Sequence, residues 1–308
     1  MGKQHSRFLN EYTLGSPENR IHDHRIFEEQ VAKKSWKSVI LSGEALSVLN
    51  LEAMRRLAGQ FNNFDVQPIL ILREWSGYLF SRWKQDIKRR DAWTFKSYIS
   101  KLEALNFEHY DCSMDLVCKR LEESFQEPPC IIGYMAAIER DKSVLPAILR
   151  AMAIPRELIN EVQEGERLNI APSNIDIERN RLSNLIYCDH NFLPEVEFFY
   201  DRPAYKKPSQ VLKFLPKVKQ SIGNNPALWS DIDNIIIETK NRFSYAHLKQ
   251  PYCKWYSKIS SEYNSLFFEG LRLKPVEEIK HWEHDIFETQ LSDVPNDIKR
   301  ELCNQLKI

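Results

Sequence analysis

A short apolar run that ends in an arginine is the segment with the clearest chemical meaning. Residues 66–72 read VQPILIL and lead directly into Arg73, and Ser81 follows eight positions after Arg73. Such a run is typical of a buried strand in a parallel sheet, and open α/β sheets bind ligands beyond the carboxyl ends of their strands. Arginine offers a charged fork of donors and serine a single hydroxyl. With Ser81 about 12 Å along the following helix, the pair can bracket one oxyanion if the turn folds back.

This spacing resembles a nucleotide-binding segment of a known enzyme family. The pattern Ile71-Leu72-Arg73, seven further residues and Ser81 is similar to the segment by which sulfotransferases hold the 3′-phosphate of 3′-phosphoadenosine 5′-phosphosulfate. The resemblance implies a sulfotransferase-like member of the P-loop superfamily, of the bacterial type that acts on polysaccharides. It therefore implies that Arg73 and Ser81 bind this sulfuryl donor and that a carbohydrate hydroxyl accepts the sulfuryl group.

Neighbouring segments resemble the same family in the same order, over about residues 36 to 190. Residues 38–47 (SVILSGEALS) resemble its strand followed by Ser-x-Glu, and residues 130–134 (CIIGY) and 149–155 (LRAMAIP) resemble a later strand and helix. In similar carbohydrate sulfotransferases a glutamate at the position of Glu44 can serve as the base for the acceptor proton. The resemblance therefore makes Glu44 the candidate catalytic residue, with a capping role at the next helix as the alternative.

The segment before residue 36 departs from the family pattern. Family members begin with a strand and a glycine-rich loop carrying Lys-x-Gly-Thr-Thr or similar, which holds the 5′-phosphosulfate. Residues 1–35 contain no such motif, and Gly2 and Gly15 stand in no phosphate-loop spacing. We therefore expect either a piece of a longer enzyme or a degenerate, non-catalytic member that binds a nucleotide or saccharide. The chain as written is expected to be inactive, and an unrelated helical protein with a small sheet is the third interpretation.

The alternation of expected strands and helices predicts an α/β fold with a small parallel sheet flanked by helices. Strands are expected near residue 39, over 66–72 and over 130–134. The family's first strand would lie between the strands at 66–72 and 130–134. An empty position there would leave backbone N–H and C=O groups unpaired, and each unpaired group costs about 1 to 3 kcal/mol if it is buried. We therefore expect these two strands to pair directly or another segment to fill the gap; the third outcome is a chain that is poorly stable alone.

The character of the chain changes beyond about residue 190, where helical segments with aromatic and basic residues predominate. Helices are expected over 211–222, 228–248 and 276–291, and residues 200–208 (YDRPAYKKP) are the best linker. We predict a sulfotransferase-like α/β domain over residues 1–200 and a mainly helical C-terminal region over residues 201–308.

Composition restricts the partners and the compartment. The 308 residues include 43 basic and 43 acidic side chains, so no global field attracts nucleic acid or an anionic membrane. The 6 cysteines form no C-x-x-C pair, which favours free thiols in a reducing compartment. No signal peptide and no run of about 20 apolar residues is visible. We expect a cytoplasmic protein with a carbohydrate or small-molecule acceptor, without nucleic acid or a membrane span, and make no prediction of its oligomeric state.

Histidines offer alternative bases and metal ligands. His22, His24 and His109 are possible bases, although each fits a surface or core position equally well. The pair His22-x-His24 lacks a third ligand in register. His281-x-x-His284 lies on an expected helix without a glutamate-bearing motif. No metal site is therefore predicted.

Two basic segments have both a binding and a structural interpretation. The helix face from Arg82 to Arg90 can contact the nucleotide or an acidic saccharide, or it can be a solvated face. Residues 249–256 (KQPYCKWY) mix aromatic residues with lysines, as surfaces that stack on saccharides or bind single-stranded nucleic acid do. Helix packing with lysines that extend to solvent explains this segment equally well.

Overall fold

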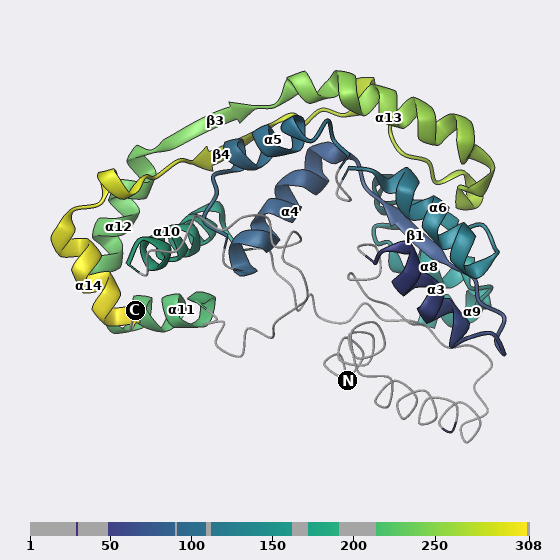
Figure 1. The fold of residues 1–308 in the computed structure, drawn as a ribbon, viewed down its shortest axis with the longest axis horizontal. Helices are drawn as coiled ribbons and strands as arrows, with labels where there is room; N and C mark the ends of the chain where they lie inside the picture. The colour runs from purple at the N-terminus through teal and green to yellow at the C-terminus, as the bar shows by residue number, and fades with distance from the viewer. Residues whose placement is uncertain are drawn as a thin grey trace. The chain divides into compact units, whose positions relative to one another are not determined.

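A computed structural model describes residues 29, 49–89, 91–108, 112–161, 172–190 and 214–306 (Figure 1). The chain divides into two compact units, each built from three separate segments. Unit 1 comprises Met1–Arg73, Glu108–Val162 and Lys254–Lys274, and unit 2 comprises Glu74–Phe107, Gln163–Cys253 and Pro275–Ile308. The predicted domain boundary between residues 200 and 201 lies outside the described residues, and neither unit is a single stretch of chain.

Two parallel strands form the sheet of unit 1. Strand β1 (Ile69–Leu72) pairs with β2 (Cys130–Gly133) in a register that sets Ile69 opposite Cys130 and Leu72 opposite Gly133. The architecture is therefore α/β with a small parallel sheet and helices, as predicted at this level. The sequence analysis expected the strands at 66–72 and 130–134 either to pair directly or to be separated by another segment. The structure shows direct pairing of β1 with β2. The strand expected near residue 39 lies outside the described residues.

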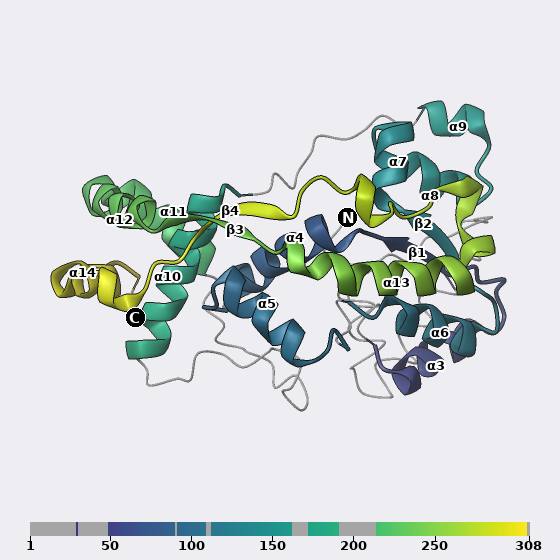
Figure 2. The same cartoon turned by 90° about the horizontal axis from the view of Figure 1, so that it is seen from above.

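Five helices of the described part of unit 1 accompany this sheet: α3 (Leu51–Gly59), α6 (Met114–Phe125), α7 (Tyr134–Asp141), α8 (Leu145–Ala151) and α9 (Arg156–Glu161). Helix α3 begins where the Oδ1 atom of Asn50 accepts a hydrogen bond from the N–H of Ala53, which caps its first turn. Its apolar face packs against α6, whereas α7 and α8 lie beside β2 (Figure 2). Burial of these apolar faces fixes the sheet within the unit.

The other side of β2 is covered by residues from the third segment of unit 1. Ile131 forms a parallel bridge with Phe267, and the N–H of Gly133 donates to the carbonyl oxygen of Leu271 at 2.8 Å. A Cβ atom at position 133 would lie 2.6 Å from the carbonyl oxygen of Arg272, closer than atoms can pack. Glycine is therefore required at the end of β2.

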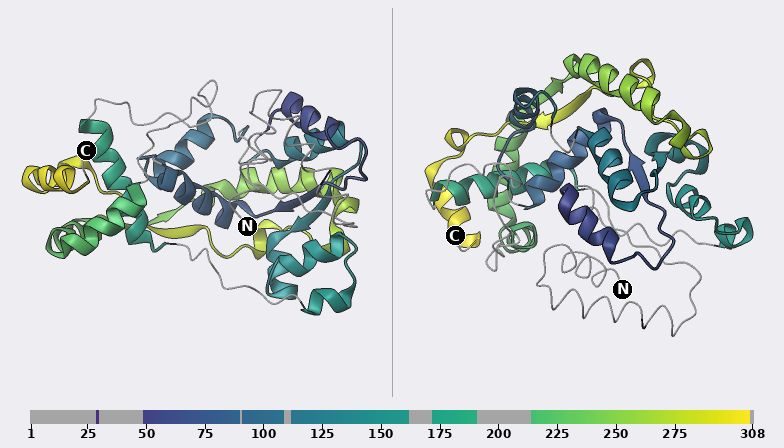
Figure 3. Two further views of the ribbon diagram at one scale, coloured as in Figure 1. Left: turned by 90° about the horizontal axis from the view of Figure 1, so that it is seen from below. Right: turned by 45° about the vertical axis from the view of Figure 1, so that its right-hand side comes forward.

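Unit 2 is mainly helical and contains a two-stranded antiparallel sheet. Its described elements are α4 (Trp75–Arg89), α5 (Phe95–Ala104), α10 (Asn174–His190), α11 (Phe214–Asn224), α12 (Pro226–Glu238), β3 (Lys240–Ser244), β4 (Glu283–Phe287) and α14 (Asn296–Leu306). Helices α10, α11, α12 and α14 share one apolar core around Trp229 and Ile232 (Figure 3). Helix α13 (Lys249–Glu262) begins in unit 2 and ends in unit 1. None of the helices in the described ranges has the length and apolar character needed to cross a membrane.

The predicted helices over 228–248 and 276–291 are wrong in part. Helix α12 ends at Glu238, and residues 240–244 and 283–287 form β3 and β4 instead. Ion pairs Lys240–Asp285 and Arg242–Glu283, at 3.0 and 2.6 Å, join the two strands on one face. This sheet depends on partners about 40 residues apart, and a local pattern does not reveal such pairing. Because His284 belongs to β4, the helical His281-x-x-His284 arrangement does not exist.

Candidate functional site

Arg73 lies at the carboxyl edge of the parallel sheet of unit 1. It directly follows β1, and Tyr134 directly follows β2, because Leu72 and Gly133 are paired in register. The Cζ atom of Arg73 lies 4.3 Å from the centre of the Tyr134 ring. This distance is typical of a cation–π contact, so the two strand ends fix the position of the guanidinium.

The donors of Arg73 are not engaged by a carboxylate within the described ranges. Arg73 forms no ion pair within the described ranges, and Glu44 lies outside the described residues. A guanidinium carries five N–H donors in a planar fork, more than a contact with one ring can engage. Such donors match the oxygens of a phosphate or sulfate group.

Helix α7 adds backbone donors to the same edge. Its first residue is Tyr134, its N-cap is Gly133, and no side chain caps its first turn. The first N–H groups of a helix have no partner within the helix and favour negative charge. Arg73 and the start of α7 therefore both contribute positive charge to this edge of the sheet.

Ser81 lies on α4 in unit 2 and is half-buried. The helix expected after Arg73 is present, and it buries Trp75, Leu79 and Trp83, which share one face of the helix. Arg73 is the last residue of a segment of unit 1, and Ser81 belongs to the other unit. The clamp formed by the two side chains therefore stays a prediction.

The remaining sequence candidates for proton transfer lie outside the described residues. This applies to Glu44, the predicted base, and to the alternatives His22, His24 and His109. Within the described ranges, no three His, Cys, Asp or Glu side chains gather in a group that could hold a metal ion. The site is therefore built from Arg73, Tyr134 and the first turn of α7.

The basic face of α4 is less solvated than its sequence indicates. The Arg82 and Asp86 side chains are only 12% and 10% exposed and form an ion pair at 3.4 Å. The ammonium of Lys84 lies 4.5 Å from the centre of the Phe80 ring. Burial, and then repulsion by Lys88, lowers the pKa of Lys84. Two of the cations proposed to contact a ligand are therefore engaged within unit 2.

Two of the three aromatic residues of the segment 249–256 pack inside the protein. Tyr252 and Trp255 are buried, whereas Lys249 and Lys254 are exposed. The Tyr252 ring packs edge-on against Trp75, with centroids 5.8 Å apart. The helix-packing interpretation is confirmed for these rings, and they offer no surface on which a sugar can stack.

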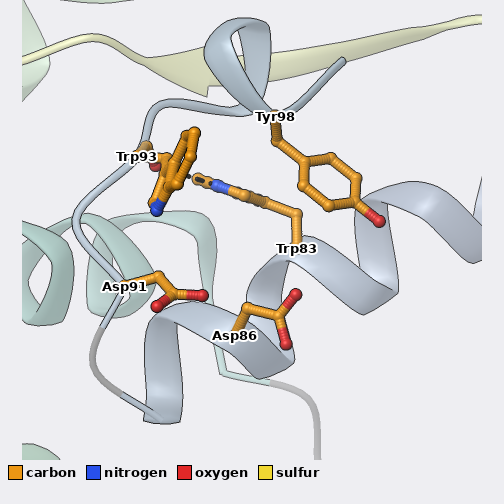
Figure 4. A pocket seen from close by; sticks show the side chains of 5 residues that line it. All are labelled: Trp83, Asp86, Asp91, Trp93 and Tyr98. Carbon is orange, nitrogen blue, oxygen red and sulfur yellow. Dashed lines mark hydrogen bonds between the residues drawn. The ribbon is translucent and has the colours of Figure 1, made fainter. Parts of the chain in front are cut away.

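A small pocket in unit 2 was missed by the sequence analysis. It is lined by Trp83, Asp86, Asp91, Trp93 and Tyr98, whose side chains surround one space (Figure 4). The indole Nε1–H of Trp83 donates to the carbonyl of Trp93 at 2.9 Å and closes one wall. The volume of about 10 Å³ holds about one water molecule. A nucleotide or sugar does not fit such a space.

His284 lies in an aromatic cluster of unit 2 that the sequence did not predict. Its ring stacks on Phe80, with centroids 3.9 Å apart, and its Nε2 atom lies 3.3 Å from the carbonyl oxygen of Ser76. The hydroxyl of Tyr245 donates to the same carbonyl at 2.5 Å. Burial lowers the pKa of His284 and raises that of Tyr245. Both rings are neutral near pH 7 and anchor β3 and β4 to the start of α4.

A buried ion pair on α10 was also missed. Arg181 and Glu178 are both 1% exposed and form an ion pair at 2.6 Å. The Nη1 atom of Arg181 donates to the carbonyl of Ala92 at 2.9 Å, and Glu178 accepts from the N–H of Thr289 at 3.1 Å. The i,i+3 spacing is the only sequence signal for this pair. These contacts join α10 to two distant loops, which is a structural role.

None of the three comparisons, with known protein families, with curated proteins and with solved structures, found a match to this chain.

Proposed function

We propose that this chain is a sulfotransferase-like protein of the P-loop superfamily that binds 3′-phosphoadenosine 5′-phosphosulfate through Arg73. The proposed reaction is transfer of the sulfuryl group to a carbohydrate hydroxyl. The observation that supports the proposal most is the position of Arg73, directly after a parallel strand and against the ring of Tyr134. Carboxyl edges of parallel strands are where open α/β folds bind nucleotides.

Each candidate residue has a defined role in this proposal. Arg73 binds two oxygens of the 3′-phosphate through its guanidinium fork, and Ser81 donates its hydroxyl to the same group. Glu44 takes the proton of the acceptor hydroxyl as that oxygen attacks sulfur. By analogy with phosphoryl transfer, most of the rate enhancement comes from positioning and from positive charge around the transferred group.

A degenerate, non-catalytic protein that binds the same nucleotide is the second candidate. The printed sequence contains no Lys-x-Gly-Thr-Thr segment, and so no lysine of that motif to neutralise the charge developing on the 5′-phosphate. Binding through the 3′-phosphate does not need that lysine. This candidate therefore predicts nucleotide affinity without sulfuryl transfer.

Calorimetry with adenosine 3′,5′-bisphosphate tests the binding that both candidates share. Arg73→Ala is expected to weaken binding about 10- to 100-fold, because a charged hydrogen bond contributes about 1.5 to 3 kcal/mol. Ser81→Ala is expected to weaken it less. Arg55→Ala is the matched control, since Arg55 is an exposed arginine on α3 of the same unit as Arg73. Equal affinities for the wild type and Arg73→Ala would refute the site.

Transfer of labelled sulfate to a carbohydrate panel separates the two candidates. If the chain is an enzyme, the wild type is expected to form the sulfated product. Glu44→Gln is then expected to form little product but to bind the nucleotide normally. If the chain is a non-catalytic protein, it is expected to bind the nucleotide and to form no product from any carbohydrate.

A further inference from the structure

The end of β2 is flanked on both sides by an arginine. Gly133 is paired with Leu72 on one side, and its N–H donates to Leu271 on the other. Arg73 directly follows Leu72, and Arg272 directly follows Leu271. The carbonyl group of Arg272 lies so close to Gly133 that a Cβ atom there would be 2.6 Å from the oxygen. Two arginines from distant segments of unit 1 therefore border the same backbone position.

Among the residues that the structure describes, the ion pairs formed near Gly133 do not include Arg73 or Arg272, so both arginines are available to bind an anion. Arg272 is exposed, and within the described ranges neither Arg73 nor Arg272 forms an ion pair.

Three acidic side chains of unit 1 that lie close to Arg272 in the chain or in α7 are engaged by other cations. Glu139 pairs with Lys274, Asp141 with Arg150 at 2.7 Å, and Glu269 with Arg140 at 2.8 Å. The charges of Arg73 and Arg272 are therefore not neutralised by these three carboxylates.

We propose that Arg272 binds the second anionic group of the nucleotide, at the 5′ position, while Arg73 binds the 3′-phosphate. This inference rests on the proposed function and adds a phosphate ligand that the sequence resemblance does not contain. In the family, the 5′ group is held by the phosphate loop. Here, the exposed side chain of Arg272, whose main chain adjoins the first turn of α7, supplies a cation for that group. The site thereby prefers ligands with two separate anionic groups over those with one.

Binding of three nucleotides to purified full-length protein tests this assignment: adenosine 3′,5′-bisphosphate, adenosine 3′-monophosphate and adenosine 5′-monophosphate. Arg272→Ala is expected to lower the bisphosphate affinity about tenfold or more, to the level of the 3′-monophosphate, and to leave 3′-monophosphate affinity unchanged. Arg73→Ala is expected to weaken binding of both 3′-phosphorylated nucleotides and to leave the affinity for the 5′-monophosphate unchanged. Arg156→Ala is the matched control, because Arg156 is an exposed arginine of unit 1 at the start of α9.

The outcomes separate this inference from the proposed function. Wild-type affinity of Arg272→Ala for the bisphosphate, together with weaker binding by Arg73→Ala, overturns the role of Arg272 and leaves the proposed function standing. Equal losses for all three nucleotides in Arg272→Ala also overturn it, because they indicate a general effect on the fold. Wild-type protein that binds no bisphosphate refutes the proposed function, and the role of Arg272 with it.

Discussion

The guanidinium of Arg73 lies over the ring of Tyr134, with 4.3 Å between Cζ and the ring centre. The two residues are 61 positions apart in the sequence and meet because each directly follows one of two strands paired in register. A strand-end arginine is usually a mobile side chain, but the ring restricts this one to a narrow range of positions. If the proposed function holds, Tyr134 positions Arg73 for the nucleotide.

Replacing the Tyr134 ring is expected to weaken nucleotide binding. Tyr134→Leu removes a cation–π contact of about 0.5 to 1 kcal/mol, so the affinity for adenosine 3′,5′-bisphosphate falls about two- to fivefold. Tyr134→Phe keeps a ring face and is expected to bind nearly as well as the wild type. Calorimetry of both variants checks this prediction, and an equal loss in both would assign the effect to the hydroxyl.

Gly133→Ala is expected to destabilise unit 1. The added Cβ would lie 2.6 Å from the carbonyl oxygen of Arg272, so the backbone of one segment has to move. Overpacking of this kind costs about 1 to 3 kcal/mol, and urea unfolding followed by circular dichroism measures it. Gly59→Ala is the control in the same unit, because a Cβ there meets no atom within 4 Å. Unchanged unfolding midpoints for both variants would contradict the close approach.

Acidification is expected to destabilise unit 2 through His284. Burial is the main cause that lowers its pKa below the usual 6.5, with Lys84 and His281 acting in the same direction. The unfolded chain therefore binds the proton more readily than the folded chain, so stability falls as the pH drops below about 6.5 towards the lowered pKa. The hydrogen bond to Ser76 and the charge of Asp285 oppose the shift without reversing it.

Unfolding midpoints at pH 7.5 and pH 5.5 measure this dependence. His284→Phe keeps a ring stacked on Phe80 and removes the titrating group. The difference between the unfolding midpoints at pH 7.5 and pH 5.5 is therefore expected to be smaller in this variant than in the wild type. An identical pH dependence in wild type and variant would exclude His284 as its source.

Breaking the Arg181–Glu178 pair is expected to cost much more than breaking a surface pair. Arg181→Met leaves a buried carboxylate without its cation, at a cost of about 3 to 5 kcal/mol. Combining it with Glu178→Gln is expected to cost less than the sum of the single changes, because the two side chains interact directly. Urea unfolding measures all three variants. Arg56→Ala, which removes the exposed Arg56–Glu52 pair of α3, is the control and is expected to change stability by less than about 0.5 kcal/mol.

The sequence by itself determined the elements whose apolar patterns are local. The runs at 66–72 and 130–134 predicted β1 and β2, and the helix expected after Arg73 is α4. The sequence also placed Arg73 at the end of a strand, because Arg73 directly follows the apolar run of residues 66–72. These features depend on residues only a few positions apart.

Only the tertiary structure decided which distant residues meet. The contact of Arg73 with Tyr134, the approach of Arg272 to Gly133 and the buried pair on α10 all join, or depend on, segments that are far apart in the chain. The pairing of β3 with β4 overrode a helical pattern in both segments. Strand pairing and burial gain their free energy from partners that a local pattern does not contain, so periodicity predicts an element but not its neighbour.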